Sequence, residues 1–179
     1  MDHPSRARSY AWRDVAVIGA LSAAYVLMIV LQVGGADVIT DADNVIETAA
    51  ALIATAFADP ERYAPERIAA ELQPTPSPLE RQFFVAYRHG YLVGAAGLKA
   101  ADWASGTHIL YLSAVAAECR GLGIGRALVR ARLDWLRQRF ASGRVLVSTS
   151  KPKRFRSLGF RRVNRAGSTG RHLMFLEYP

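Results

Sequence analysis

ECRGLGIGRALVRARLDWLRQRF, residues 118–140, places three glycines two positions apart in front of an apolar segment rich in arginine. Apolar residues recur in this segment at helical spacing, so we expect an amphipathic helix over 125–140 with one broad face on a sheet: Val129, Leu133, Leu136 and Phe140, joined by Leu128 and Trp135. Arginines are expected to fill much of the remaining face: Arg126, Arg130, Arg132, Arg137 and Arg139. The preceding residues, HILYLSAVA (108–116), are rich in β-formers and predict a strand.

Glycines between a strand and a helix suit the binding of an anion. Such a turn points several backbone N–H groups into one concavity, where the helix dipole adds positive potential. Glycine also permits positive φ and has no Cβ to block a phosphate. We therefore expect Gly121, Gly123 and Gly125 to cradle a phosphate or diphosphate, with Arg120 and Arg126 nearby. The alternative is a tight turn that binds no ligand.

Two common phosphate-binding motifs do not fit this turn. The dinucleotide motif G-x-G-x-x-G fails because Arg126 occupies the place of its last glycine, and the motif G-x-x-x-x-G-K-[ST] lacks its lysine. The pattern that remains is R-x-x-G-x-G, formed by Arg120, Gly123 and Gly125.

The rest of the chain predicts one mixed α/β domain. Helical spacing predicts two early helices, and turn signals and β-formers predict a hairpin followed by further strands. With the strand and helix described above, the order is ααβββαβαβ, which implies a mixed sheet covered by helices. The remaining helices are expected over 43–57 and 64–72 and in the short basic segment that ends with FRSLGF (155–160), and the remaining strands over 83–87, 91–98, 144–147 and 172–178.

AVAAECRGLGIGRALV (114–129) resembles the acetyl-CoA-binding motif of the GNAT superfamily of acyl-CoA N-acyltransferases, V-x-P-E-x-R-G-x-G-x-G-x-x-L. Ala117 stands at the usual proline. Downstream, FRSLGF (155–160) resembles the family's lYeklGF element. The resemblance covers residues 37–179 and implies a GNAT-like fold with flanking helices, a central, mostly antiparallel sheet, and strands that splay apart at 108–116 and 144–147.

The resemblance implies an N-acetyltransferase domain with acetyl-CoA as co-substrate and no metal. The acetyl group would pass by direct attack to a primary amine of an unidentified small molecule or protein. The CoA diphosphate would lie on the backbone of Arg120, Gly121, Leu122, Gly123, Ile124 and Gly125, with Arg126 beside it. The pantetheine arm would pair with Ala114, Val115 and Ala116. An N–H group near Ser113 or Ala114 would polarise the thioester carbonyl.

The chain departs from the family pattern at the acid that protonates the departing thiolate. The tyrosine of lYeklGF is Phe155 here, which cannot donate a proton. Alternation along the third strand places Ile109, Tyr111, Ser113 and Val115 on one face. Tyr111 is therefore the first catalytic candidate, as a water relay or proton donor, and Ser113 is the second. The alternative for Tyr111 is a half-buried tyrosine of the sheet.

Other chemical groups are weaker candidates. Cys119 and Glu118 occupy the motif itself, where filling and organising the turn are the simpler roles, and His108 has the opposite parity to Tyr111. Trp103 is a candidate lining of the acceptor side. The basic run over 151–165 has two interpretations. In the first it contacts the 3′-phosphate of CoA or an acidic acceptor, and in the second it is a solvated face.

The first 36 residues form a separate N-terminal extension. Residues 15–33, VAVIGALSAAYVLMIVLQV, carry no charge and would span about 28 Å as a helix, close to the hydrocarbon thickness of a bilayer. This predicts a transmembrane anchor. Two alternatives stay open: a start at Met28 followed by a strand over 29–33, or a buried helix. Because acetyl-CoA is cytoplasmic, we place the catalytic domain there, either tethered to the inner membrane or soluble.

Composition limits the functional classes. The chain has 179 residues, 51% of them hydrophobic, enough for one domain with a core. One cysteine excludes an internal disulfide and a cysteine-rich zinc site. The net charge of +8 suits an anionic ligand. Two other functions stay open: a catalytically weak CoA-binding regulatory module, suggested by Phe155, and a nucleic-acid partner, which no basic motif interleaved with aromatics supports.

Overall fold

The computed structural model describes residues 15–18, 28–33, 42–73, 81–163 and 170–179. Its helices are α1 (Ala42–Phe57), α2 (Pro65–Leu72), α3 (Ile124–Arg139) and α4 (Pro152–Arg156). Its strands are β1 (Val15–Ile18), β2 (Met28–Val33), β3 (Arg81–Arg88), β4 (Tyr91–Ala100), β5 (Thr107–Val115), β6 (Gly143–Thr149), β7 (Arg161–Arg162) and β8 (His172–Tyr178). The predicted order ααβββαβαβ is therefore confirmed from α1 onward, with the two-residue β7 added between α4 and β8.

The described strands form one mixed sheet in the order β1-β2-β3-β4-β5-β6-β8-β7. Neighbouring strands are antiparallel except for the pairs β2–β3 and β5–β6. The β3–β4 hairpin turns at His89 and Gly90, both with positive φ, as expected of a two-residue turn that matches the twist of its strands. The mostly antiparallel mixed sheet predicted from the sequence is thus confirmed.

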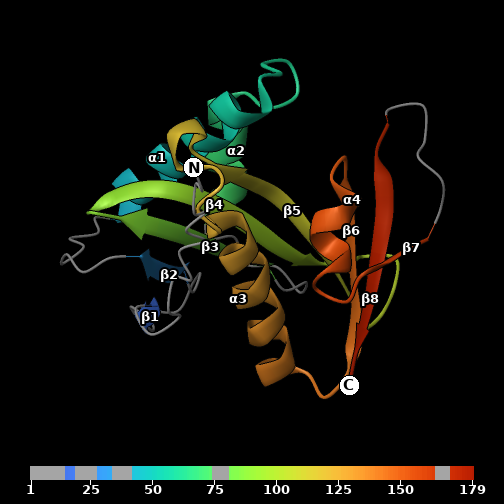
Figure 1. Cartoon of the computed structure of the whole chain (residues 1–179). Helices are drawn as coiled ribbons and strands as arrows, with labels where there is room; N and C mark the ends of the chain where they lie inside the picture. Colours follow the sequence, from blue (N-terminus) through green and yellow to red (C-terminus); the bar gives the residue numbers. More distant parts are fainter. Residues whose placement is uncertain (1–14, 19–27, 34–41, 74–80, 164–169) are drawn as a thin grey trace, which may run out of the picture.

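Helices cover both faces of the sheet (Figure 1). On one face, α1 and α2 pack against β3, β4 and β5 through a buried cluster that includes Ile53, Ile68 and Val85. On the other face, α3 packs through a larger cluster that includes Leu128 and Leu136. Two separate apolar layers therefore hold the central strands, and any side chain of β5 faces one layer or the other.

The pair β5–β6 opens after four residues. The paired residues run from Thr107 opposite Arg144 to Leu110 opposite Val147. Beyond that point β5 continues to Val115 and β6 to Thr149 without pairing to each other, and Figure 1 shows the strands β6 and β8 standing apart from β3–β5. The predicted splay of these two strands is confirmed, and it leaves one edge of β5 free from residue 111 onward.

A bulge interrupts β5 in the same stretch. Leu112 has φ of +44°, which is unusual for a branched side chain. The register with β4 shifts there, from Gly97 opposite Tyr111 to Ala95 opposite Ala114. A bulge inserts one residue and reverses which face the following side chains occupy. Residues before and after Leu112 therefore do not follow one alternation.

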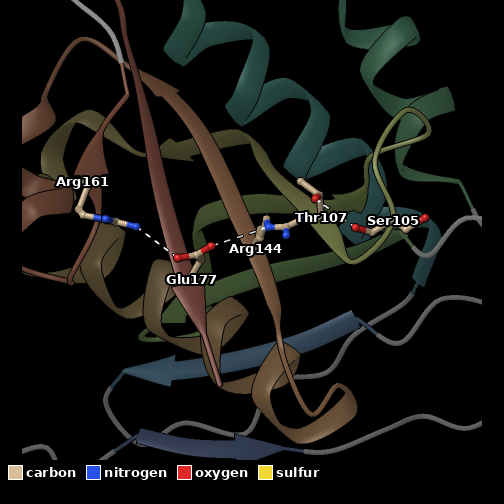
Figure 2. Close-up of polar contacts among 5 residues, drawn as sticks. All are labelled: Ser105, Thr107, Arg144, Arg161 and Glu177. Carbon is tan, nitrogen blue, oxygen red and sulfur yellow. Dashed lines mark hydrogen bonds and ion pairs between the residues drawn. The ribbon is translucent and has the colours of Figure 1, made fainter.

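The second arm of the split sheet is formed by β6, β8 and β7. Glu177 on β8 lies between two arginines (Figure 2): its Oε1 is 3.8 Å from Arg144 Nε and its Oε2 is 3.3 Å from Arg161 Nη2. More than half of each of these side chains is exposed, so each pair stabilises the arm by less than about 1 kcal/mol. Backbone pairing along β6–β8, from Gly143 to Thr149, is the main support of this arm.

The N-terminal apolar run differs from the predicted helix. Its two described ends are strands, β1 and β2, paired antiparallel, and β2 continues the sheet beside β3. Both ends are rich in valine and isoleucine, which favour strands where a sheet edge is available for pairing. The alternative of a strand over 29–33 agrees with β2. Residues 19–27 lie outside the described residues. Within the described part, no helix is both long and apolar enough to cross a bilayer.

Candidate functional site

The turn between β5 and α3 holds two glycines in left-handed backbone. Gly121 and Gly123 both have φ of +85°, a conformation that residues with a Cβ rarely adopt. A Cβ placed at either position would meet no atom within 4 Å, so open space lies beside both. The backbone angle, rather than crowding inside the protein, is what requires glycine here.

Five consecutive backbone N–H groups in this turn, those from Gly121 to Gly125, donate to no acceptor within the described residues. Hydrogen bonds lie on either side of them: the Arg120 N–H donates to the Ala117 carbonyl at 3.2 Å, and the Arg126 N–H to the Gly123 carbonyl at 2.9 Å. The first N–H groups of a helix lack intrahelical partners and carry the positive end of its dipole. The turn is thus a row of available donors that begins one residue later than predicted, because the amide of Arg120 is used in the single turn of 3-10 helix at Ala117–Cys119.

The strand end before the turn is fixed by two hydrogen bonds. The Ala116 N–H donates to the Val93 carbonyl on β4 at 2.9 Å. The Arg120 side chain turns back, and its Nε donates to the Val115 carbonyl at 3.3 Å. Ala114 is buried on the face of α1 and α2, whereas Val115 packs against the cluster under α3. These contacts hold the end of β5 in place while its other edge remains free of β6.

Two apolar residues of the turn have different environments. Leu122 is 43% exposed, and Ile124 is buried under α3. Ile124 therefore anchors the first turn of the helix in the core. Leu122 contributes its backbone to the row of N–H groups and leaves its side chain at the surface.

Gly125 lies directly under the guanidinium of Arg154 from α4. A Cβ at Gly125 would be 2.9 Å from Arg154 Nη2, so only glycine allows the two groups to lie this close without a shift. The Arg154 side chain makes no hydrogen bond or ion pair with any described residue. Its backbone N–H donates to the Lys151 carbonyl at 3.2 Å, and its carbonyl accepts from the Ser157 hydroxyl at 3.0 Å. A guanidinium from a second helix therefore lies beside Gly125, the last residue of the row of available amides. The sequence pattern places Arg154 only within the basic run over 151–165, because its contact with Gly125 is tertiary.

Ser113 and Tyr111, the two catalytic candidates, lie on opposite faces of β5. Tyr111 packs with the cluster of α1 and α2, while the hydroxyl of the exposed Ser113 accepts a hydrogen bond from Arg132 of α3 at 2.9 Å. The prediction that both share one face is wrong, because the bulge at Leu112 inserts a residue between them. Period-two alternation cannot reveal a bulge, which depends on the register with β4.

Tyr111 lies against Gly97, where the absence of a Cβ leaves room for its ring: an added Cβ would be 2.5 Å from Tyr111 Cε1. Lys99 Nζ lies 4.9 Å from the centre of the same ring. Within the described residues, the Tyr111 hydroxyl is buried without a hydrogen-bond partner. Burial, followed by the negative charge of Glu71, raises the pKa of Tyr111 far above its ordinary value, against the opposing effect of Arg81. Tyr111 is thus a neutral phenol, able to donate a proton but not to act as a base.

Glu71 of α2 is a carboxylate that the sequence did not single out. It lies on the Tyr111 side of the sheet, where its Oε2 is 3.6 Å from Arg81 Nη1. About a third of each of these two side chains is exposed. The carboxylate and the phenol together bring an acceptor and a donor to the α2 side of β5, which suits a ligand bearing an amine. No feature of the 64–72 pattern distinguishes Glu71 from other surface acids of a helix.

Arg132 is buried, contrary to its predicted place on the solvent face of α3. It has no exposed surface, and burial lowers the pKa of its guanidinium to about 9, which leaves it a cation at neutral pH. Its helical neighbours Leu128 and Leu136 are also buried, so position 132 falls in their row at spacing of four. The spacing of four from Leu128 and Leu136 therefore indicates a buried position, but the charge of arginine led to the prediction of a solvent-facing one.

Phe155 lies in the core and not at a polar site. It is 7% exposed and packs edge-on against Phe160 at a centroid distance of 5.3 Å. Cys119 is a free, buried thiol. Within the described residues, no group of three histidine, cysteine, aspartate or glutamate side chains could hold a metal ion.

Trp103 and His108 lie at the far end of the sheet. With Phe140 they line a cavity of about 450 Å³ in the β4–β5 connection. The eight residue steps along β5 from Thr107 to Val115 correspond to about 26 Å, so the structure does not bring this cavity to the glycine turn. Trp103 lines this cavity, and its expected place on the acceptor side stays a prediction.

Comparisons with known proteins agree with this geometry. The model of the Acetyltransferase (GNAT) family matches residues 49–162. No curated protein matches the chain. Among solved structures, an acyl-CoA N-acyltransferase from Pseudomonas aeruginosa superposes with a TM-score of 0.60 at 17% identity, covering 76% of this chain and 91% of that one.

Two further structures share the fold. ElaA from Escherichia coli gives a TM-score of 0.61 at 14% identity, with 76% of this chain and 90% of that chain covered. PaiA N-acetyltransferase from Thermoplasma acidophilum, in complex with coenzyme A, gives 0.57 at 16% identity, with coverage of 76% and 92%. At these identities the structures establish the fold, while the family model covers more than half of the sequence. The chain belongs to the GNAT family of acetyltransferases.

Proposed function

We propose that this protein transfers the acetyl group of acetyl-CoA to a primary amine by direct attack, and that it does so in the cytoplasm, where acetyl-CoA is found. Membership of the GNAT family supports an acyl-CoA-dependent N-acetyltransferase in general. The observation that carries the proposal is the row of five N–H groups without protein acceptors at the start of α3. Such a row, with the helix dipole behind it, is suited to a diphosphate.

The coenzyme would be held at two places. Its diphosphate accepts hydrogen bonds from the amides of Gly121 to Gly125, and the Arg154 guanidinium beside Gly125 adds a positive charge. Its pantetheine arm lies along Ala114–Ala116, on the edge of β5 that β6 leaves free. An extended chain that adds to a free strand edge gains backbone hydrogen bonds.

The reaction then needs a neutral amine and stabilisation of the thioester oxygen. The amine nitrogen attacks the thioester carbonyl, a backbone N–H near Ser113 or Ala114 stabilises the oxyanion, and the C–S bond breaks as the electron pair moves to sulfur. The amine proton leaves to a base or to water. Glu71 is the carboxylate on the Tyr111 side of the sheet, and Tyr111, which stays protonated, serves as a hydrogen-bond donor.

The competing function is a CoA-binding module with weak catalysis or none. Phe155 favours it, because a buried phenyl ring cannot protonate a thiolate. Both functions require coenzyme binding, and they differ in turnover.

The first experiment supplies acetyl-CoA and a panel of primary amines: amino acids, polyamines, aminoglycosides and peptide N-termini. We expect release of CoA thiol that requires both enzyme and amine, with an acetylated product of matching mass. Coenzyme binding without turnover on any amine would favour the regulatory module. Absence of coenzyme binding would reject both functions.

Gly123 tests the amide row. Gly123→Ala forces a Cβ into left-handed backbone or turns the amides away, so CoA should bind about tenfold more weakly when one or two charge-assisted hydrogen bonds are lost. Calorimetric titration with CoA measures this. Gly106→Ala is the matched control, because Gly106 also has positive φ and open space around it but lies in the β4–β5 turn. Equal CoA affinity in both variants would contradict the proposed site.

Arg154 tests the added charge. Arg154→Ala should weaken CoA binding by about tenfold at low salt, since one charge-assisted contact to phosphate is lost, and by less at high salt because exposed charges are screened. The control is Arg156→Ala, a second exposed arginine of the same short helix. If both variants weaken binding equally, the effect reflects general positive charge and not the position of Arg154 over Gly125.

A substitution at Tyr111 tests whether its buried phenol is neutral in the folded protein. Its raised pKa means that the folded protein keeps a proton that the unfolded chain releases above about pH 10. Wild type should therefore lose stability relative to Tyr111→Phe as the pH rises above that value. Chemical unfolding at several pH values, with tyrosinate absorbance recorded, measures this. Tyr91→Phe, at a residue that is 76% exposed, is the control. A pH dependence that is the same in wild type and Tyr111→Phe would contradict the burial of a neutral phenol.

A further inference from the structure

Among the described residues, no carboxylate pairs with the buried guanidinium of Arg132. Its Nε donates to the Leu128 carbonyl at 2.9 Å, and its Nη1 donates to the Gly97 carbonyl and the Ser113 hydroxyl, each at 2.9 Å. Its Nη2 is buried without a partner among the described residues. Desolvation alone accounts for the shift in its pKa. Within the part of the chain that the structure describes, no opposite charge offsets this positive charge.

Burying the Arg132 guanidinium without an opposite charge lowers the free energy of unfolding. A buried cation is tolerated when it is paired, and an apolar side chain of similar size is often neutral or better at such a position. Leu128 and Leu136, one turn before and one turn after, are buried in the same row of α3, so we expect an apolar side chain to be compatible with this position. An unpaired cation in this row is therefore explained better by a negative charge that arises nearby during function than by stability.

Ser113 connects Arg132 to the free edge of β5. The serine is exposed, follows the bulge at Leu112, and lies in the stretch that no longer pairs with β6. Its oxygen accepts from Arg132, which leaves the hydroxyl proton to be donated elsewhere. Among the described residues, the acceptor for that proton is the Tyr111 carbonyl, at a long 3.4 Å. A hydroxyl polarised by a cation and lacking a good acceptor is a ready donor to an anion.

We propose that the Ser113 hydroxyl donates a hydrogen bond to the sulfur of CoA as it leaves as a thiolate, and that Arg132 is the positioning residue that orients and polarises this hydroxyl. The inference rests on the proposed function. When the tetrahedral C–S bond breaks, its electron pair stays on sulfur, Ser113 keeps its proton while donating the hydrogen bond, and the amine proton goes to base or water. The pair thereby supplies the stabilisation that Phe155 cannot.

Other charged and titratable groups on this face of the sheet could also affect a thiolate. They are His108 on β5, Cys119, Arg120 and Arg126 around the glycine turn, and Arg154 on α4. Arg120, Arg126 and Arg154 are exposed. The test must therefore compare variants that change only Ser113 or Arg132.

The ionisation of bound CoA thiol gives a test that needs no acceptor. Calorimetry measures the Kd of CoA and of desulfo-CoA, which lacks the sulfur, from about pH 6 to about pH 8.5, a range around the pKa of a thiol. If the pair lowers the thiol pKa by about one unit, CoA affinity should rise about fivefold over that range relative to desulfo-CoA. In Ser113→Ala and Arg132→Met the rise should disappear, while desulfo-CoA binds as in wild type.

Two controls make the result specific. Arg130→Met removes an exposed arginine of the same helix, and Ser113→Thr keeps a hydroxyl. Both should keep the pH-dependent rise. We expect Arg132→Met to be at least as stable as wild type, since it removes an unpaired buried charge. Should that variant fail to fold, Ser113→Ala decides alone, because an exposed serine is not needed for packing.

The outcomes separate the inference from the function on which it rests. If neither CoA nor desulfo-CoA binds wild type, the proposed function fails. If both bind equally at every pH, the coenzyme site stands and the thiolate role of Ser113 and Arg132 is overturned. A rise that persists in Ser113→Ala also overturns it.

Discussion

The structure depends on a row of backbone N–H groups at the start of α3 that have no acceptor among the described residues. From Gly121 to Gly125 the N–H groups find no partner in the described chain, and leaving such groups unsatisfied is costly unless water or a ligand accepts from them. The two left-handed glycines are what permit the turn. This glycine turn fixes where α3 begins, and from that point α3 covers one face of the sheet.

The split sheet and the bulge decide which polar side chains lie on each side of β5, the strand that leads to this row of N–H groups. β6 leaves β5 after Leu110, and Leu112 shifts the register immediately afterwards. As a result Tyr111 faces α1 and α2 while Ser113 faces α3. Two polar groups two residues apart in sequence therefore serve different sides of one strand. We infer that the acceptor amine approaches from the side of Tyr111 and Glu71, and that the coenzyme sulfur lies toward Ser113.

Much of this architecture could be predicted from the sequence, because helical and alternating periodicity depends on neighbours along the chain. The glycine turn and the order of elements from α1 onward are predictable in this way, whereas the splay of two strands was expected only from the resemblance to the GNAT superfamily. The bulge was not, since it depends on how β5 pairs with β4. Arg132 was assigned to solvent by residue type although Leu128 and Leu136 mark its row as buried. The contact of Arg154 with Gly125 and the strand ends of the 15–33 run arise from tertiary pairing, which no local pattern contains.

The central claim is that the amides of Gly121 to Gly125 receive the coenzyme diphosphate. Two-dimensional nitrogen–proton NMR of labelled protein during titration with CoA tests it most directly. We expect the amide resonances of Gly121, Gly123 and Gly125 to move together and to saturate with the calorimetric Kd, while those of Gly90 and Gly106 stay in place. Saturable CoA binding that leaves the three turn glycines unmoved would contradict it.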